Sequence, residues 1–311
     1  MKPITPVNSK VGFVGIGYMG RPIAQRLLES GFKLSAYDRN RGKAQELVRS
    51  GGSVVQTVSE LSGCNVILSC LPSDEAVLDI YRGPDGVYAN ISPGSVIIDM
   101  STVYPETSRE LSRLGSEHGI QVLDVTISGS VPAAEQGSLI LFGGGDQESF
   151  DSAESIFRVI ARKYFYLGPN GAGATMKLVV NTLLGTEMQA IAEAIVLGEK
   201  AGLDRHRLLE VLAETAVVAP AHLGKLQRAM SGDYSPQFPL WLMNKDFGLI
   251  LYLAATVGAR MPATEAAFEV NARQSDQGQE QDFSAVIVQM EKQAHLDSAE
   301  NGQIRAMQKS T

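Results

Sequence analysis

The sequence predicts an α/β fold, in which a doubly wound parallel sheet is followed by an all-α C-terminal domain joined to it by a long helix. Two observations predict this fold. Up to about residue 168, short apolar runs rich in β-branched residues alternate with amphipathic helical patterns, as they do in successive βαβ units. Beyond that point the strand signals stop, and a helical pattern over about 175–201 precedes further helices.

The predicted strands are the apolar runs at 11–15, 33–37, 65–70, 95–100, 121–127 and 138–144. Helical patterns lie between them, for example at 19–30, 40–50, 104–119 and 146–160. Apolar strands that alternate with helices indicate a parallel sheet covered on both faces. The segment GPNGAG, residues 168–173, interrupts regular structure before the long helix. We therefore expect a first domain over 1–168 and a helical domain for substrate binding and oligomerisation over 169–311.

Composition excludes several classes of function. The chain has 311 residues, of which 44% are hydrophobic and 20% charged, which is ordinary for a globular protein with a sizeable core. Its net charge of −7 argues against binding to the phosphate backbone of nucleic acid. No segment predicts a membrane span or a secretory signal. The cysteines, Cys64 and Cys70, are too few for a disulfide framework and fit a reducing cytoplasm.

A glycine motif opens the first domain. The stretch VGFVGIGYMG, residues 11–20, has G-x-G-x-x-G spacing between an apolar strand and an amphipathic helix. The spacing alone is a weak signal, which a chance glycine turn would also give. In this position, however, Gly15 permits a tight turn, Gly17 lets the backbone approach a pyrophosphate, and Gly20 lets the helix pack on the strand. We therefore predict a Rossmann-type dinucleotide-binding domain.

The identity of the dinucleotide depends on the turn after the second strand. Asp38 ends that strand, where an acid accepts hydrogen bonds from the ribose hydroxyls and repels a 2′-phosphate, which favours NAD. Arg39 and Arg41 follow at once, and arginine binds phosphate well. The alternative for both arginines is a solvated helix start. NAD is slightly favoured, and NADP stays open.

Two polar residues interrupt the long helix, whose apolar pattern otherwise indicates a buried central helix. Lys177 and Asn181 are four residues apart, which puts both on one helix face. A lysine in the first turns can extend to solvent. Alternatively it faces a cleft, where burial lowers its pKa and lets it transfer a proton near neutral pH. Asn181 would then bind the substrate oxygen or orient the ammonium group. The residues alone leave both readings open.

These features resemble the β-hydroxyacid dehydrogenases, the family of 3-hydroxyisobutyrate dehydrogenase and 6-phosphogluconate dehydrogenase. The resemblance extends from about residue 10 to 290 and lies in four blocks: GFVGIGYMG (12–20), DVTISGSVPAAEQGSL (124–139), GAGATMKLVVN (171–181) and NKDFGLIL (244–251). Within the family the sequence is most similar to the glyoxylate/succinic semialdehyde reductases. Their versions of ISGSVPAAEQGSLI and of YSPQFPL (234–240) look like those of this chain.

The resemblance assigns the second block to the substrate carboxylate. The family pattern there is usually D-x-P-V-S-G-G, and this chain has Thr126 in place of the proline and Ser130 in place of the second glycine. Ser128, Gly129 and Ser130, which we call the carboxylate cradle, would supply N–H donors and hydroxyl groups without any arginine. A structural turn between strand and helix is the alternative.

The resemblance implies the remaining site residues one by one. Lys177 and Asn181 would be catalytic, and Thr102, Phe238 and Asp246 would join the cradle in binding substrate, although Phe238 also suits a core position. The cofactor would contact Gly15, Ile16, Gly17, Tyr18, Met19, Gly20, Asp38, Arg39, Asn40, Leu71, Pro72, Thr102 and Lys245. The four histidines lack ligand spacing, so no metal is expected.

The resemblance therefore implies an NAD(P)H-dependent reductase of small aldehyde-acids, glyoxylate or succinic semialdehyde, with Lys177 as general acid/base. A 3-hydroxyisobutyrate-type dehydrogenase acting oxidatively is the main alternative. An imine reductase and a non-catalytic cofactor-binding module share the fold, but both lack the lysine that this chain keeps. We also expect a cytoplasmic homodimer or homotetramer, with a small carboxylate substrate and no nucleic-acid or membrane partner.

Overall fold

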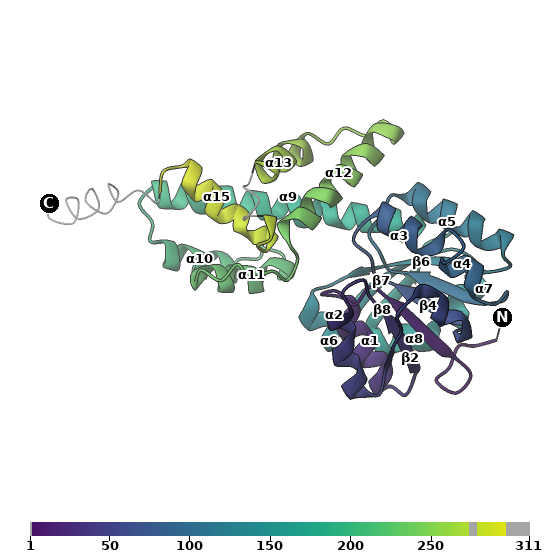
Figure 1. Cartoon of the computed structure of the whole chain (residues 1–311). Helices are drawn as coiled ribbons and strands as arrows, with labels where there is room; N and C mark the ends of the chain where they lie inside the picture. The colour runs from purple at the N-terminus through teal and green to yellow at the C-terminus, as the bar shows by residue number, and fades with distance from the viewer. Residues whose placement is uncertain (1, 274–278, 297–311) are drawn as a thin grey trace, which may run out of the picture. The chain divides into compact units, whose positions relative to one another are not determined.

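The computed structural model describes residues 2–273 and 279–296. The chain divides into two compact units, Met1–Val180 and Asn181–Thr311, so the division falls inside the long helix rather than at the predicted boundary of 168/169. The first unit contains an eight-stranded sheet and the second is helical (Figure 1). The predicted fold class is confirmed.

The elements of the first unit follow one another in βα alternation. The strands are β1 (Lys10–Val14), β2 (Lys33–Tyr37), β3 (Ser53–Val54), β4 (Val66–Ser69), β5 (Val96–Asp99), β6 (Gln121–Ser128), β7 (Leu139–Gly144) and β8 (Ala161–Tyr166). The helices are α1 (Gly20–Glu29), α2 (Arg41–Gln45), α3 (Asp74–Tyr81), α4 (Val87–Asn90), α5 (Pro105–Glu117), α6 (Val131–Glu135), α7 (Gln147–Ser152) and α8 (Glu154–Ile160), with 3-10 helices η1 (Glu46–Ser50) and η2 (Val58–Gly63).

The sheet has the strand order β3-β2-β1-β4-β5-β6-β7-β8, so the chain reverses direction across the sheet between β1 and β4. Strands β1 to β6 are mutually parallel. Strand β7 pairs antiparallel to β6, and β8 pairs parallel to β7. The sequence predicted a parallel sheet, whereas β7 and β8 run opposite to the other strands.

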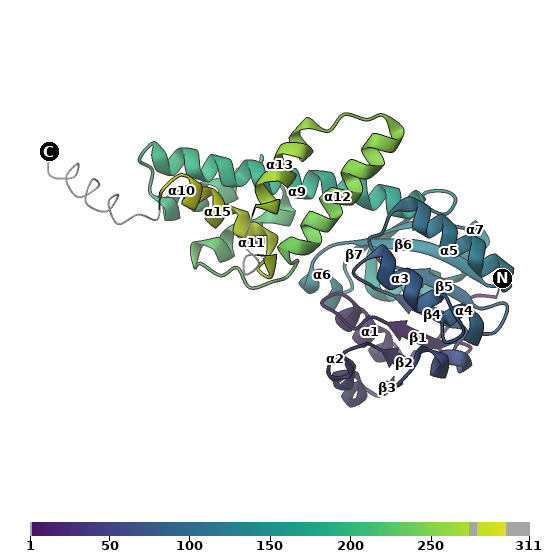
Figure 2. The same ribbon diagram turned by 45° about the horizontal axis from the view of Figure 1, so that its top comes forward.

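Apolar side chains alternate between the two faces of the central strands. In β4, Val66 and Leu68 belong to one buried cluster and Ile67 to another. Helices α1 and α8 contribute to the first cluster, and α3 and α5 to the second. Figure 2 shows α3 and α5 on one side of the sheet and α1 on the other. Burial on both faces explains why the strands appear in the sequence as continuous apolar runs.

Two predicted helices differ from the structure, and strand β8 was not predicted. The helix expected at 40–50 is a short α2 followed by the 3-10 helix η1, and the helix at 146–160 is divided into α7 and α8 at Ala153. Strand β8 was missed because exposed Arg162 and Lys163 interrupt its apolar character. Charged side chains are usual on a strand at the edge of a sheet.

The second unit continues the long helix α9 (Ala172–Lys200). It contains α10 (Arg205–Glu214), α11 (Pro220–Met230), α12 (Leu240–Val257), α13 (Pro262–Ala272), the 3-10 helix η3 (Phe283–Ala285) and α15 (Val286–Gln293). Helices α10 and α11 pack together, as do α12 and α13. By length and composition alone α12 could cross a membrane. Lys245 and Asp246 interrupt it, and a third of its residues, Phe247 included, are buried within the unit.

Candidate active site

The residues predicted for the site in the first unit lie together at one edge of the sheet. Parallel strands end at the same edge, and ligands of such sheets bind outside these carboxyl ends, near the point where the strand order reverses. The glycine loop follows β1, Asp38 follows β2, Leu71 follows β4, Thr102 follows β5, and Ser128 ends β6. The pairing of these strands thus brings together segments that are more than a hundred residues apart in the chain.

The glycine loop has the geometry that a pyrophosphate requires. Gly15 has a φ of 92°, and a Cβ atom on it would lie 2.3 Å from the Cys70 carbonyl oxygen. A Cβ atom on Gly20 would lie 1.9 Å from the Gly15 carbonyl oxygen, so only glycine lets α1 begin so close to the strand. Around Gly17 a Cβ atom would meet nothing within 4 Å, which leaves room beside the backbone at the amino end of α1. The loop therefore fits a dinucleotide.

Asp38 connects the glycine loop to the turn after β2. The backbone N–H of Ile16 donates to its Oδ2 atom over 2.8 Å, and the N–H of Asn40 donates to its Oδ1 atom over 2.7 Å. Asn40 caps α2 by accepting from the Gly42 N–H over 3.1 Å. Arg39 is exposed. The carboxylate holds the loop, and each oxygen keeps a second lone pair for a ribose hydroxyl.

A buried network that the sequence analysis missed lies beneath the ends of β4 and β5. Asp99 is 1% exposed, and its Oδ1 atom accepts hydrogen bonds from the hydroxyls of Ser69 and Ser101, each 2.6 Å long. Tyr81 donates to the Ser69 hydroxyl over 2.6 Å, and the N–H of Leu71 donates to the Ser101 hydroxyl over 2.9 Å. The network thus holds the segment predicted to border the nicotinamide. The sequence signal that could have revealed this network is Asp99 itself, an acid at the end of a central apolar strand.

The carboxylate cradle lies at the end of β6. Ser128 is half-buried, whereas Gly129 and Ser130 are exposed. Gly129 has a φ of 138°, and Ser130 precedes α6 without making a capping hydrogen bond from its side chain. Because β6 runs parallel to β1, this turn lies at the same sheet edge as the glycine loop.

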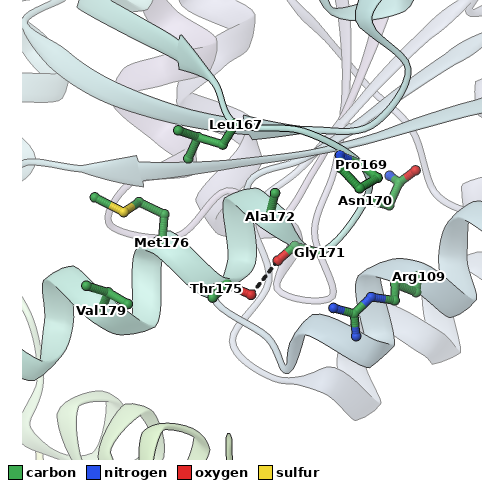
Figure 3. Close-up of a pocket in the computed structure, with 9 residues that line it drawn as sticks. All are labelled: Arg109, Leu167, Pro169, Asn170, Gly171, Ala172, Thr175, Met176 and Val179. Atoms are coloured by element: carbon green, nitrogen blue, oxygen red, sulfur yellow. Dashed lines mark hydrogen bonds between the residues drawn. The ribbon is translucent and has the colours of Figure 1, made fainter. Parts of the chain in front are cut away.

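Lys177 lies in the second turn of α9 and is half-buried. Beside the start of this helix is a cavity of about 350 Å³, lined by Arg109, Leu167, Pro169, Asn170, Gly171, Ala172, Thr175, Met176 and Val179 (Figure 3). The Thr175 hydroxyl donates to the Gly171 carbonyl across its wall over 2.7 Å. None of the predicted site residues lines this cavity, although Met176, the neighbour of Lys177 in the chain, does.

The second unit holds the other predicted catalytic residue. Asn181 and Asp246 are both buried, and the Asn181 amide donates to the Asp246 Oδ2 atom over 2.6 Å. The Lys245 ammonium lies 2.8 Å from the Asp246 Oδ1 atom. The Asp246 carboxylate thus joins α9 to α12 and neutralises Lys245.

Phe238, the predicted pocket aromatic, is half-buried, and its ring meets that of Phe283 edge to face at 5.6 Å. A buried ion pair that the sequence analysis missed holds its backbone. Asp282 accepts from the Phe238 N–H over 3.0 Å and from the Lys225 ammonium over 2.7 Å. Burial alone would raise the pKa of Asp282, but the Lys225 charge and these hydrogen bonds hold it below its usual range. In residues 2–273 and 279–296, no group of three or more His, Cys, Asp or Glu residues is arranged to hold a metal ion.

Comparisons with known proteins identify the family of the chain. Residues 10–168 match the model of the NAD-binding domain of 6-phosphogluconate dehydrogenase, and residues 171–290 match that of the NAD-binding domain of NADP-dependent 3-hydroxyisobutyrate dehydrogenase. Glyoxylate/succinic semialdehyde reductase 1 of Arabidopsis thaliana is 37% identical over 281 residues, which are 89% of this chain and 97% of that protein. The 2-(hydroxymethyl)glutarate dehydrogenase of Eubacterium barkeri is 32% identical over 282 residues, 89% of this chain and 93% of that protein.

A solved structure of 3-hydroxyisobutyrate dehydrogenase from Mycobacterium tuberculosis with L-serine is similar, with a TM-score of 0.78 and 29% identity over 90% of this chain and 98% of that chain. The fold and site define a nicotinamide-dependent oxidoreductase that acts on CH–OH groups. The chain belongs to the 3-hydroxyisobutyrate dehydrogenase-like β-hydroxyacid dehydrogenases.

The buried Asp99 network predicts a dependence of stability on pH. Burial, partly offset by the hydrogen bonds from Ser101 and Ser69, raises the pKa of Asp99 to about 6. In the window between its ordinary pKa and about 6, the folded state binds more protons than the unfolded state, so the free energy of unfolding falls as the pH rises. Asp99→Asn removes the ionisable group, and with it this pH-dependent loss of stability. The difference in free energy of unfolding between the variant and wild type should therefore be about 2–3 kcal/mol more favourable to the variant at pH 8 than at pH 4.

Urea unfolding of both proteins at the two pH values measures this difference. Asp146→Asn is the control with the opposite sign, because hydrogen bonds from Ser149 lower the pKa of the exposed Asp146. Its stabilisation is present above the ordinary carboxyl pKa and is lost as the pH falls. An Asp99→Asn variant with the same pH dependence as wild type would contradict the prediction.

Proposed function

We propose that the protein is an NAD(P)H-dependent reductase that converts small aldehyde-acids, such as glyoxylate and succinic semialdehyde, to hydroxy acids. One observation carries the proposal. The carboxylate cradle ends β6 at the sheet edge where the glycine loop lies, so a short acid held there lies close to a bound dinucleotide. The similarity to glyoxylate/succinic semialdehyde reductase 1 supports this substrate class.

In the proposed reaction the Ser128 and Gly129 backbone and hydroxyl donors hold the substrate carboxylate. A bound NAD(P)H supplies the hydride that the aldehyde carbon accepts. The Lys177 ammonium stabilises the negative charge that develops on the aldehyde oxygen and then gives it a proton. Asn181 fixes the position of that oxygen or orients the ammonium. In the reverse direction neutral Lys177 removes the hydroxyl proton, and Thr102 borders the substrate.

Oxidation of a 3-hydroxyisobutyrate-type hydroxy acid is the second candidate, because the same cradle suits its carboxylate. The similarity to the 2-(hydroxymethyl)glutarate dehydrogenase supports this second candidate function. Steady-state assays with glyoxylate, succinic semialdehyde, methylglyoxal, tartronate semialdehyde and 3-hydroxyisobutyrate, each with both cofactors, test the proposal. We expect the highest kcat/KM for one of the aldehyde-acids. A preference for methylglyoxal, which has no carboxylate, would contradict the proposal.

Lys177→Ala should lower kcat by roughly 10²–10⁴-fold, the range for a lost general acid–base group, and leave cofactor binding intact. The measurement is kcat with the best aldehyde, together with NAD(P)H binding by fluorescence titration. Lys200→Ala, at the exposed end of the same helix, is the matched control and should keep wild-type kcat. A Lys177→Ala variant with near wild-type kcat would overturn the assignment.

NADH should be preferred slightly over NADPH. The Asp38 carboxylate is held at the loop by Ile16, and a 2′-phosphate placed against it would meet a like charge. Asp38→Asn removes the repulsion and leaves Arg39 in place, so the preference should shift toward NADPH. The measurement is kcat/KM for both cofactors with one aldehyde. A wild-type preference for NADPH of about tenfold, equivalent to 1.4 kcal/mol, would contradict the prediction and would mean that Arg39 and Arg41 determine the cofactor preference.

We also propose a homodimer or homotetramer. Helix α9, expected to be buried, instead leaves Val179, Leu183 and Leu197 exposed, and the helical period puts all three on one face, which supports contact with a second copy of the chain. Light scattering should give a mass of two or four chains, and Leu183→Glu should lower it. Val7→Glu, at an exposed valine far from α9 in sequence, should not. A wild-type monomer at micromolar concentration would contradict the proposal.

A further inference from the structure

The start of α9 is fixed to β6 by a buried carboxylate. Asp124 is 2% exposed, and the backbone N–H groups of Gly171 and Ala174 donate to its two oxygens, each over 3.0 Å. The Asn170 amide also donates to it, over 3.3 Å. These donors belong to the amino end of a helix, where a negative charge is favourable.

A second contact between β6 and α9 is made by Thr126, two residues after Asp124. The hydroxyl of Thr126, which is fully buried, donates to the Gly173 carbonyl over 2.8 Å and lies 3.4 Å from the Phe142 carbonyl. A Cβ atom on Gly173 would lie 2.3 Å from the Asp124 carbonyl oxygen, so the helix backbone rests directly on the strand. Gly173 precedes Lys177 by four residues, the spacing of the helical hydrogen bond.

The strand continues from these contacts into the carboxylate cradle. Alternate residues of a strand point to one face, so Asp124, Thr126 and Ser128 share a face of β6. The first two hold α9 and the third belongs to the cradle. The family that this chain resembles usually has proline at position 126, which offers no hydroxyl. The Thr126 contact is therefore a feature of this sequence.

We propose that Asp124 and Thr126 are positioning residues, which fix the first turns of α9, and with them Lys177, relative to the carboxylate cradle. This inference rests on the proposed function, because it depends on the role of Lys177. An error of about 1 Å in the placement of a catalytic group can cost roughly 10²-fold in rate. Neither residue touches the substrate or the cofactor, so the effect should appear in kcat and not in cofactor affinity.

The test uses three full-length variants. Thr126→Val keeps the shape and removes the hydroxyl, Thr126→Ser keeps the hydroxyl, and Asp124→Asn removes the negative charge. For each, the number of NADH-binding sites is titrated by fluorescence, and kcat is expressed per titrated site. This readout separates misplacement of Lys177 from partial unfolding, which lowers the number of sites but not the rate at each. Thr264→Val, at a buried threonine in α13, is the matched control.

We expect Thr126→Val and Asp124→Asn to lower kcat per site by roughly 10–100-fold with an unchanged Kd for NADH. Thr126→Ser should recover most of the wild-type rate, and Thr264→Val should keep it. Wild-type kcat per site in Thr126→Val would overturn the inference, as would a loss that Thr126→Ser does not reverse. If Asp124→Asn does not fold, the threonine series decides alone. Failure of the proposed function is distinguishable, because Lys177→Ala would then keep its activity.

Discussion

The site depends on one geometric constraint, the common edge at which parallel strands end. Strands β1, β2, β4, β5 and β6 run in one direction, so the loops that follow them must lie side by side. Along that edge Asp38 comes first, then the glycine loop, then the segments after β4 and β5, and then the carboxylate cradle. Most residues of the central strands are apolar and buried, so the residues at the strand ends and in the loops after them specify the ligands.

Buried carboxylates hold these loops in place. Burying an ion costs free energy unless hydrogen bonds or an opposite charge compensate for it, and for Asp99 and Asp124 hydrogen bonds offset only part of that cost. Asp99 fixes the segment after β4 through Ser101, and Asp124 fixes the start of α9. In the helical unit Asp246 binds Asn181, and Asp282 holds the backbone of the Phe238 segment. These four carboxylates therefore fix the positions of the loops and helices that carry candidate site residues.

The sequence predicted the regular parts of the fold well. The strand at 33–37 matches β2, and the other five lie within one residue of the observed ends, because apolar runs between helices have few other structures open to them. Strand β8 was missed because its stability comes from pairing with β7 and not from its own apolar residues. Motif spacing selected the candidate site residues from the sequence, and their roles stay predictions. The networks around Asp99 and Asp282 were not, since their partners, such as Ser69 and Lys225, are brought together only by tertiary packing.

The central claim is that the cradle recognises a carboxylate while Lys177 serves the aldehyde oxygen. The most direct measurement compares kcat/KM for glyoxylate with that for glycolaldehyde, an aldehyde of similar size in which a hydroxymethyl group replaces the carboxylate. A site built to hydrogen-bond a substrate group leaves its donors unpaired when that group is missing. The account predicts that kcat/KM for glyoxylate is higher by at least about 100-fold. Equal values for the two aldehydes would contradict it.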